Sequence, residues 1–282
     1  MTLVPATDFN GPAKRRRSTA RRGELGEQGV RMPYAINEGI RIHYRVEGAG
    51  APLVLQHGFT DSLESWYENG YVEPLKRDYQ LVLVDARGHG ASGKPHEPDA
   101  YAMRLRVGDI LAVLRDLGIS RTNYFGYSMG GWIGFGVAKY APEHLGALII
   151  GAASPGPRQR AGAGLLADDA IRQGAAAILK MWDASLPAAV TERILANDMD
   201  AIRAAITDDP GYEDILPAIK VPTLLIAGDV DPVYAATEAA AAKIPNARFV
   251  PLPGLSHVGA LFRSDLMVPH IAGFLRAAAW QG

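Results

Sequence analysis

Residues 124–135 read YFGYSMGGWIGF, the part of the chain that is most informative about its fold. A short apolar run leads into a G-x-S-x-G turn at 126–130, and residues with a helical pattern follow. A serine on a sharp turn between a buried strand and a helix sits in a strained backbone geometry. The residues two positions before and after it must then lack bulk, because the chain closes on itself there. Gly126 and Gly130 meet that requirement, so the stretch predicts a strand, a tight turn presenting Ser128, and a helix.

Outward from this turn, the chain alternates between strand and helix patterns. Short, nearly continuous apolar runs occur at 53–55, 81–84, 123–125, 148–150, 224–226 and 249–250. Strands buried on both faces, as in a parallel sheet covered by helices, have this composition. Helical spacing lies between the runs, for example over 107–117 with Gly118 as a C-cap, and again in a last helix around 271–275.

The alternation has an antiparallel beginning. Residues 40–47 alternate apolar and polar side chains, which predicts a half-exposed strand, and residues 37–39 (Asn-Glu-Gly) predict a hairpin turn before it. Such a start followed by repeated strand–helix units predicts an α/β fold with a mostly parallel sheet and right-handed crossovers.

Residues 155–220 interrupt this rhythm. They carry no strand pattern, and helical spacing occurs instead at 171–182, 188–195 and 199–206. We predict a core formed by residues 32–154 and 221–282, with residues 155–220 as a helical insertion over one edge of the sheet.

A serine nucleophile needs a base, and the base needs an acid that orients it. His257 follows the last strand pattern, and Asp231 follows the run at 224–226. All three side chains therefore come after strands of one parallel sheet and lie at the same edge. Asp229 is the rival acid, but Asp231 stands further from the strand end, on a loop able to reach His257. We predict that Ser128, His257 and Asp231 are catalytic.

Two backbone N–H groups are candidates for an oxyanion hole. Residues 55–59 read LQHGF, a buried strand running into a glycine turn. The N–H groups of Phe59 and of Met129, directly after the nucleophile, can both point at a developing oxyanion. His57 is assigned to bracing this loop through hydrogen bonds, and the turn-rich segment 85–92 is assigned a structural role.

Composition and charge exclude several classes of protein. The chain has 282 residues, no cysteine, 29 Lys and Arg against 30 Asp and Glu, and no apolar run of spanning length. Disulfides, thiolate metal sites and cysteine nucleophiles are excluded, and a reducing, cytoplasmic location is expected. Charge gives no reason to expect a nucleic-acid or membrane partner.

The first 31 residues differ in composition from the rest, with seven basic and three acidic side chains. This composition predicts a disordered basic tail, with a nucleic-acid-binding arm as the alternative.

Together these motifs resemble the α/β-hydrolase-fold superfamily over about residues 32–280. The motifs are the glycine turn at 57–59, Asp85-x-Arg87-Gly88-His89-Gly90-x-Ser92, the serine turn at 126–131, Gly228-x-x-Asp231 and His257. The resemblance implies an eight-stranded sheet flanked by helices, with the insertion as a helical cap between strands six and seven. The order Ser128, Asp231, His257 along the chain also matches the order of the catalytic triad in this superfamily.

Ser128 favours the serine esterase-like branch, since epoxide hydrolases and haloalkane dehalogenases of the family carry aspartate at that position. The expected function is hydrolysis of small, largely apolar carboxylic esters through an acyl-enzyme, with no metal or organic cofactor. Tyr127, Val258, Met181 and Trp182 are the candidate pocket residues. Enol-lactone hydrolysis, carbon–carbon bond hydrolysis, cofactor-free perhydrolysis and a non-hydrolytic binding protein stay open, as does homo-oligomerisation.

Overall fold

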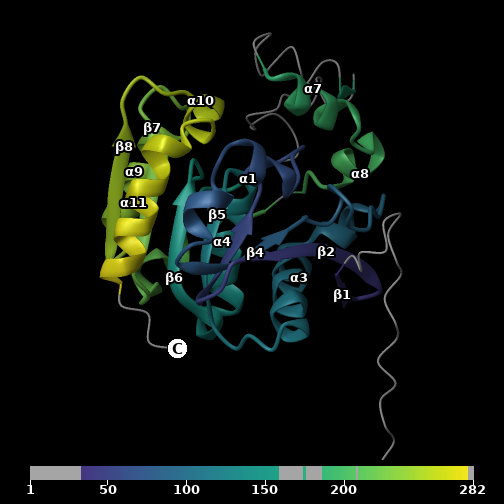
Figure 1. The fold of residues 1–282 in the computed structure, drawn as a ribbon, viewed down its shortest axis with the longest axis horizontal. Coiled ribbons are helices and arrows are strands. Elements are labelled where there is room, and N and C mark those ends of the chain that lie inside the picture. Colours follow the sequence, from purple (N-terminus) through teal and green to yellow (C-terminus); the bar gives the residue numbers. More distant parts are fainter. Residues whose placement is uncertain (1–32, 159–173, 176–185, 208, 279–282) are drawn as a thin grey trace, which may run out of the picture.

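The computed structural model describes residues 33–158, 174–175, 186–207 and 209–278, and its fold is drawn in Figure 1. The predicted basic tail at 1–31 lies outside the described residues.

A single eight-stranded sheet forms the centre of the fold, with strand order β1-β2-β4-β3-β5-β6-β7-β8. The strands are β1 Tyr34–Asn37, β2 Ile40–Glu47, β3 Ala51–Gln56, β4 Tyr79–Val84, β5 Thr122–Tyr127, β6 Leu145–Gly151, β7 Thr223–Gly228 and β8 Ala247–Leu252. β1 pairs antiparallel with β2, and β2 pairs antiparallel with β4. Every other neighbouring pair is parallel. The predicted fold class is confirmed.

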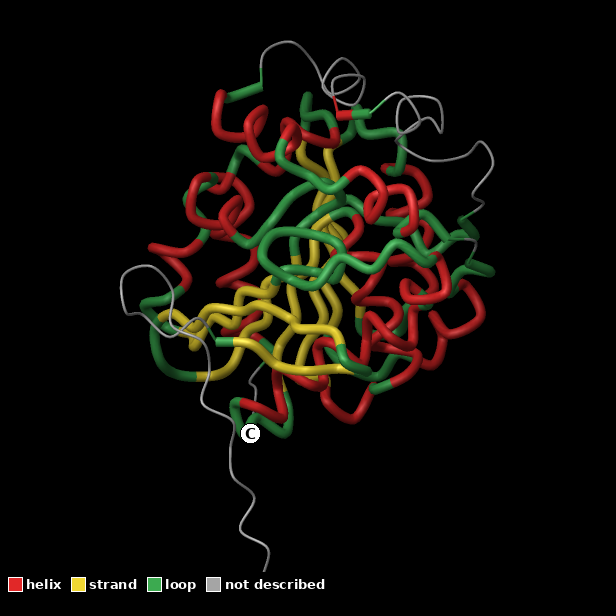
Figure 2. Tube along the Cα trace, turned by 90° about the vertical axis from the view of Figure 1, so that its right-hand side faces the viewer, coloured by secondary structure: helices red, strands yellow, loops and turns green. Residues whose placement is uncertain are grey.

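Helices cover both faces of this sheet (Figure 2). The α-helices are α1 Glu64–Glu68, α2 Val72–Leu75, α3 Met103–Asp116, α4 Met129–Tyr140, α7 Ala188–Leu195, α8 Met199–Ala204, α9 Tyr234–Lys243, α10 His257–Leu261 and α11 Ser264–Ala277. Short 3-10 helices lie at η1 Pro98–Tyr101, η2 Pro142–His144 and η3 Glu213–Ala218.

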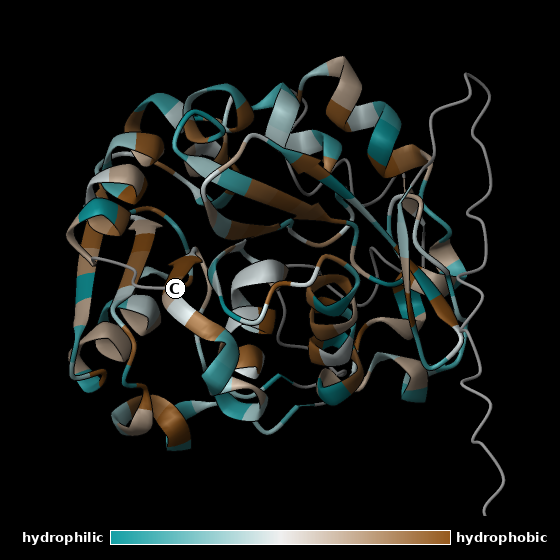
Figure 3. Ribbon diagram, turned by 60° about the horizontal axis from the view of Figure 1, so that its bottom comes forward, coloured by the Kyte–Doolittle hydropathy of each residue, from teal (hydrophilic) through white to brown (hydrophobic). Residues whose placement is uncertain are grey.

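The core lies in two layers, one on each side of the sheet. Successive side chains of a strand point to opposite faces. Val54 and Val82 therefore pack with α3, α4 and α9, whereas Leu53 and Leu81 pack with α1, α2 and α11. Brown, hydrophobic stretches lie along several of the strands in Figure 3, beside teal, hydrophilic ones. This two-sided burial explains why the strand runs are continuously apolar.

The predicted hairpin turn is present, and β1 and β2 are joined by two residues, Glu38 and Gly39. Glu38 and Gly39 have φ angles of +49° and +80°, as a turn that matches the twist of a hairpin requires. Two residues of β2 differ from the expected alternation, and one of them is Val46, which is 37% exposed. Alternation places His43 on the exposed side, but its side chain is buried because its Nδ1 lies 2.7 Å from the carboxylate of Asp85.

The segment between β6 and β7 carries helices where the structure describes it. α7 has the predicted bounds of 188–195, and α8 ends at Ala204, two residues before the predicted end. The predicted helix at 171–182 lies outside the described residues except for 174 and 175. Within the described ranges, no helix has the length and apolar character needed to cross a membrane.

Candidate active site

Ser128 occupies the turn between β5 and α4 in a strained conformation. Its φ and ψ are +54° and −113°, a region that residues with a side chain rarely adopt. The two flanking glycines make this turn feasible. A Cβ on Gly126 would lie 2.1 Å from the carbonyl oxygen of Gly130, and one on Gly130 would lie 2.0 Å from that of Gln56. The close approach inferred from the motif is therefore present.

Ser128, His257 and Asp231 form one hydrogen-bonded chain. His257 Nε2 lies 2.9 Å from Ser128 Oγ, and His257 Nδ1 lies 2.7 Å from Asp231 Oδ2. Because a carboxylate only accepts, Nδ1–H donates to Asp231, and Nε2 is left to accept the hydroxyl proton. The structure thus brings together three side chains that are distant in the sequence.

The acid and the base are both held by further contacts. The side chain of Asp231 is 0% exposed, and its Oδ1 accepts from the N–H of Val233 at 3.0 Å. His257 is the first residue of α10 rather than a loop residue, and its carbonyl accepts from the Tyr127 hydroxyl at 2.6 Å. These contacts fix the direction of the imidazole.

Asp229, the rival acid, has a different partner. Its Oδ1 accepts from the N–H of Gly254 at 2.7 Å, on the turn that precedes His257. This aspartate therefore braces the histidine loop, while Asp231 contacts the ring itself.

The loop after β3 lies directly beside the nucleophile. A Cβ on Gly58 would stand 3.5 Å from Ser128 Cβ, so the peptide that carries the N–H of Phe59 is adjacent to the serine. His57 Nδ1 donates to the Gly58 carbonyl at 2.7 Å, and its Nε2 accepts from the N–H of Ala86 at 3.0 Å. Since a trans peptide is planar, fixing the Gly58 carbonyl also fixes the opposite direction of the Phe59 N–H.

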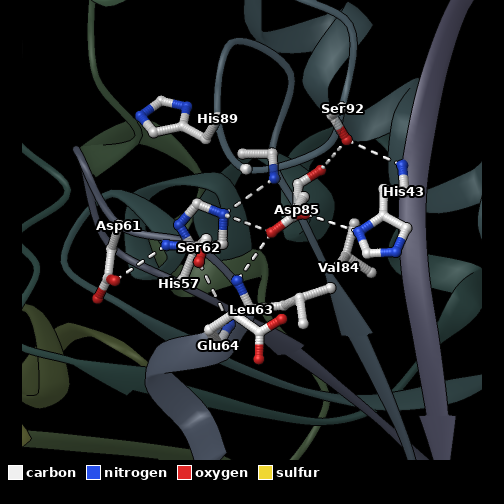
Figure 4. A network of polar contacts seen from close by, with 12 residues as sticks. His43, His57, Asp61, Ser62, Leu63, Glu64, Val84, Asp85, His89 and Ser92 are labelled. Carbon is white, nitrogen blue, oxygen red and sulfur yellow. Dashed lines mark hydrogen bonds and ion pairs between the residues drawn. The ribbon is translucent and has the colours of Figure 1, made fainter. Parts of the chain in front are cut away.

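Asp85 anchors the base of this loop, as Figure 4 shows. Its Oδ1 accepts from the N–H of Leu63 at 2.8 Å, and its Oδ2 accepts from the N–H of Ala91 at 2.9 Å and from His43 Nδ1 at 2.7 Å. Burial by itself raises the pKa of Asp85, but these hydrogen bonds and the nearby His57 hold it below its usual value. The carboxylate is therefore a charged centre that holds the surrounding backbone in place.

A cleft opens over Ser128 and His257, with about 550 Å³ of space not occupied by atoms when the open solvent at its mouth is included. Of the predicted pocket residues, Tyr127 and Val258 line it, and Met181 and Trp182 lie outside the described residues. The sequence did not reveal the remaining lining, which comes from the loop after β3, from α7 and the residues before it, and from the end of α10 and the residue after it: Thr60, Asp61, Leu186, Val190, Arg193, Ile194, Leu261 and Phe262. The spacing of Val190 and Ile194, four residues apart on α7, is the one signal that pointed to a shared helix face.

Arg193 is the cationic side chain of this wall. Its Nε lies 2.5 Å from Asp61 Oδ1, and its Nη1 lies 2.7 Å from Glu68 Oε2. Burial lowers the pKa of Arg193, but the two carboxylates outweigh that effect and raise it. The guanidinium is therefore a permanent cation held between two anions.

Among the residues that the structure describes, no cluster of three or more His, Asp or Glu side chains has a geometry suited to a metal ion.

Comparison with known proteins defines the family. Residues 51–206 match the family model described as the alpha/beta hydrolase fold, so the chain belongs to this family. Its eight-stranded sheet agrees with that assignment, and a hydrolase is the class of enzyme that the family supports.

Several relatives cover most of the chain. A putative 2-succinyl-6-hydroxy-2,4-cyclohexadiene-1-carboxylate synthase of Bacillus subtilis is 26% identical over 79% of this chain and 90% of its own length. A non-heme haloperoxidase of Rhodococcus erythropolis is 27% identical over 87% of this chain and 100% of its own. The crystal structure of the enol-lactonase from Burkholderia xenovorans LB400 has a TM-score of 0.76 at 26% identity, covering 86% of this chain and 100% of that one.

Proposed function

We propose that the protein is a serine hydrolase that cleaves carboxylic esters of small, largely apolar substrates through an acyl-enzyme. The observation that carries this proposal is the hydrogen-bonded chain from Ser128 through His257 to Asp231 at the floor of the cleft. The cleft wall is largely apolar, which suits the acyl or alcohol part of such an ester.

In the proposed mechanism, His257 Nε2 removes the proton of Ser128 as Oγ attacks the ester carbonyl. Asp231 keeps the proton on Nδ1 and stabilises the imidazolium that forms. The backbone N–H groups of Phe59 and Met129 donate to the oxyanion, and each such donor contributes about 3 kcal/mol to transition-state stabilisation.

The tetrahedral intermediate then collapses. His257 gives its proton to the departing alcohol, and the acyl group stays on Ser128 Oγ. A water deprotonated by the same nitrogen attacks the acyl-enzyme, and the acid leaves as the serine regains its proton. All atoms and protons are accounted for by the side chains described above and one water.

In this function, a cap over the nucleophile would be formed by residues 155–220. Support comes from α7, whose Val190, Arg193 and Ile194 line the cleft together with Ser128 and His257. Met181 and Trp182 belong to the same inserted segment and remain proposed pocket residues. Residues from this cap would select the acyl group, while the core would supply the chemistry.

Hydrolysis of an enol-lactone is the second candidate. A lactone is a cyclic ester, so the same nucleophile, base and oxyanion donors would open it. The likeness in fold and in sequence to the Burkholderia xenovorans enol-lactonase favours this variant of the reaction.

Turnover of short-chain nitrophenyl esters by the wild type and by Ser128→Ala tests the function. The variant should lose about 10⁴-fold or more in kcat, because the nucleophile acts as a unit with its base. Turnover by the variant within tenfold of wild type would refute the role of Ser128. A panel of esters and enol-lactones then separates the two candidates by kcat/KM.

A further inference from the structure

One hydrogen bond joins α7 to the loop that carries Phe59. Asn197, just after α7, donates from Nδ2 to the carbonyl of Thr60 at 2.8 Å, across 137 residues of sequence. The same nitrogen donates to the carbonyls of Arg193 at 3.1 Å and Ile194 at 3.2 Å. Carbonyls only accept, so the orientation of this amide follows from its three partners.

Thr60 needs such a hold because its backbone is strained. Its φ is +62°, in the left-handed region that a β-branched residue rarely adopts, and its side chain is buried. A conformation of this kind persists only where its surroundings determine it. The hydrogen bond from Asn197 to the Thr60 carbonyl is one of the contacts that hold this conformation.

Phe59 therefore lies between two fixed carbonyls. On its N-terminal side, His57 of the core holds the carbonyl of Gly58. On its C-terminal side, Asn197 of the insertion holds the carbonyl of Thr60. Because the carbonyls of the residues before and after Phe59 are both held, the Phe59 N–H beside Ser128 has little freedom to turn.

Two further contacts join the same elements. Arg193 of α7 pairs with Asp61, the residue after Thr60. The Phe59 side chain packs against the cluster formed by Ile194 of α7 and Ile202 of α8. The insertion thus contacts the loop through a hydrogen bond, an ion pair and apolar packing.

We propose that Asn197 is a positioning residue that aims the Phe59 N–H at the oxyanion, so that the insertion completes an oxyanion hole built on the core. This inference rests on the proposed function, since an oxyanion forms only if Ser128 attacks a carbonyl. Asn197 acts through the Thr60 carbonyl and touches no substrate in this role.

The test compares Asn197→Ala with a matched control, Asn246→Ala. Asn246 also donates from Nδ2 to a distant backbone carbonyl, that of Lys220 at 3.0 Å. It precedes β8 and so lies at the opposite end of the parallel strands from Ser128. Each substitution removes a side-chain amide that donates to a distant backbone carbonyl, and only the Thr60 carbonyl lies near Ser128.

Complete loss of an oxyanion donor costs 10²- to 10³-fold in kcat, and a displaced donor loses part of that. We expect Asn197→Ala to lower kcat about 10- to 100-fold with KM within about threefold of wild type. Rates are normalised to the fraction of Ser128 that a fluorophosphonate labels, which removes any effect of misfolded protein. Asn246→Ala should retain kcat within about twofold.

A pair of ketones gives a readout that loss of structure alone would not produce. An alkyl trifluoromethyl ketone forms a tetrahedral adduct with an oxyanion on Ser128, whereas the matching methyl ketone binds without that charge. Asn197→Ala should weaken inhibition by the trifluoromethyl ketone by the same factor as kcat and leave the methyl ketone unchanged. If Asn197→Ala does not fold, Asn197→Leu keeps the side-chain volume without the donor and should give the same result.

Two outcomes count against the inference and can be told apart. Equal kcat and equal trifluoromethyl ketone affinity in the Asn197 and Asn246 variants would overturn the positioning role while leaving the hydrolase in place. A wild type with neither ester turnover nor fluorophosphonate labelling at Ser128 would overturn the proposed function, and the inference with it.

Discussion

The substitution Asp231→Asn is expected to trap His257 in the tautomer that cannot deprotonate Ser128. In the wild type, Asp231 Oδ2 accepts from His257 Nδ1 and Oδ1 accepts from the N–H of Val233. An amide has only one oxygen. If that oxygen faces Val233, the NH₂ group faces His257 and donates to Nδ1, so the ring proton moves to Nε2, toward the serine.

The alternative orientation of the amide is disfavoured by the same geometry. Turning the oxygen toward His257 would place the NH₂ group 3.0 Å from the N–H of Val233, donor against donor, at a side chain with 0% exposure. An unpaired donor in such a buried place costs about 1–3 kcal/mol. The wrong tautomer should therefore dominate, and such an exchange costs about 10⁴-fold in kcat, or about 5 kcal/mol.

The assay is kcat for a nitrophenyl ester at neutral pH, with thermal unfolding recorded for each variant. Asp229→Asn is the matched control, because an asparagine oxygen can still accept from the N–H of Gly254. It should retain kcat within about fivefold, since its partner is the backbone and not the imidazole. A kcat for Asp231→Asn within tenfold of wild type, or an equal loss in both variants, would refute the reasoning.

Two further expectations concern stability. Gly130→Ala should lower the free energy of unfolding by about 3 kcal/mol in urea titrations, because its Cβ would lie 2.0 Å from the Gln56 carbonyl. Gly273→Ala, with nothing within 4 Å of the added carbon in α11, should instead stabilise by up to about 1 kcal/mol, and equal effects would contradict the argument. Asp85→Asn should remove a contribution that is present above the carboxyl's unfolded pKa and lost as pH falls through its lower folded pKa. The two proteins should therefore differ most in stability near neutral pH and converge in acid, whereas a constant difference would argue against a charged Asp85.

Most of the fold and the central part of the site are readable from the sequence. Continuous apolar runs mark strands that lie between two layers of helices, and the runs at β3 to β7 fall inside the observed strands. In a parallel sheet the residues after the strands share one edge, which is why Ser128, Asp231 and His257 could be grouped without coordinates.

What the sequence does not reveal depends on contacts between distant segments. The alternation in β2 predicts an exposed His43, but its side chain is buried beside Asp85. The local pattern does not reveal this contact, because Asp85 comes 42 residues later in the chain. The cleft wall depends on which face of α7 turns toward Ser128, and local periodicity does not specify the partner of a helix face. Asn197 resembles any polar residue at a helix end, and its contact with Thr60 arises only from the way the insertion folds back.

The spacing of the proposed triad also has a consequence for translation. Ser128 is synthesised 129 residues before the histidine to which it is hydrogen-bonded. At about 5–20 residues per second, the growing chain carries the serine without its base for roughly 6–26 seconds. Throughout that interval the hydroxyl has no His257 to accept its proton, so a nascent or prematurely terminated chain lacks the activated nucleophile.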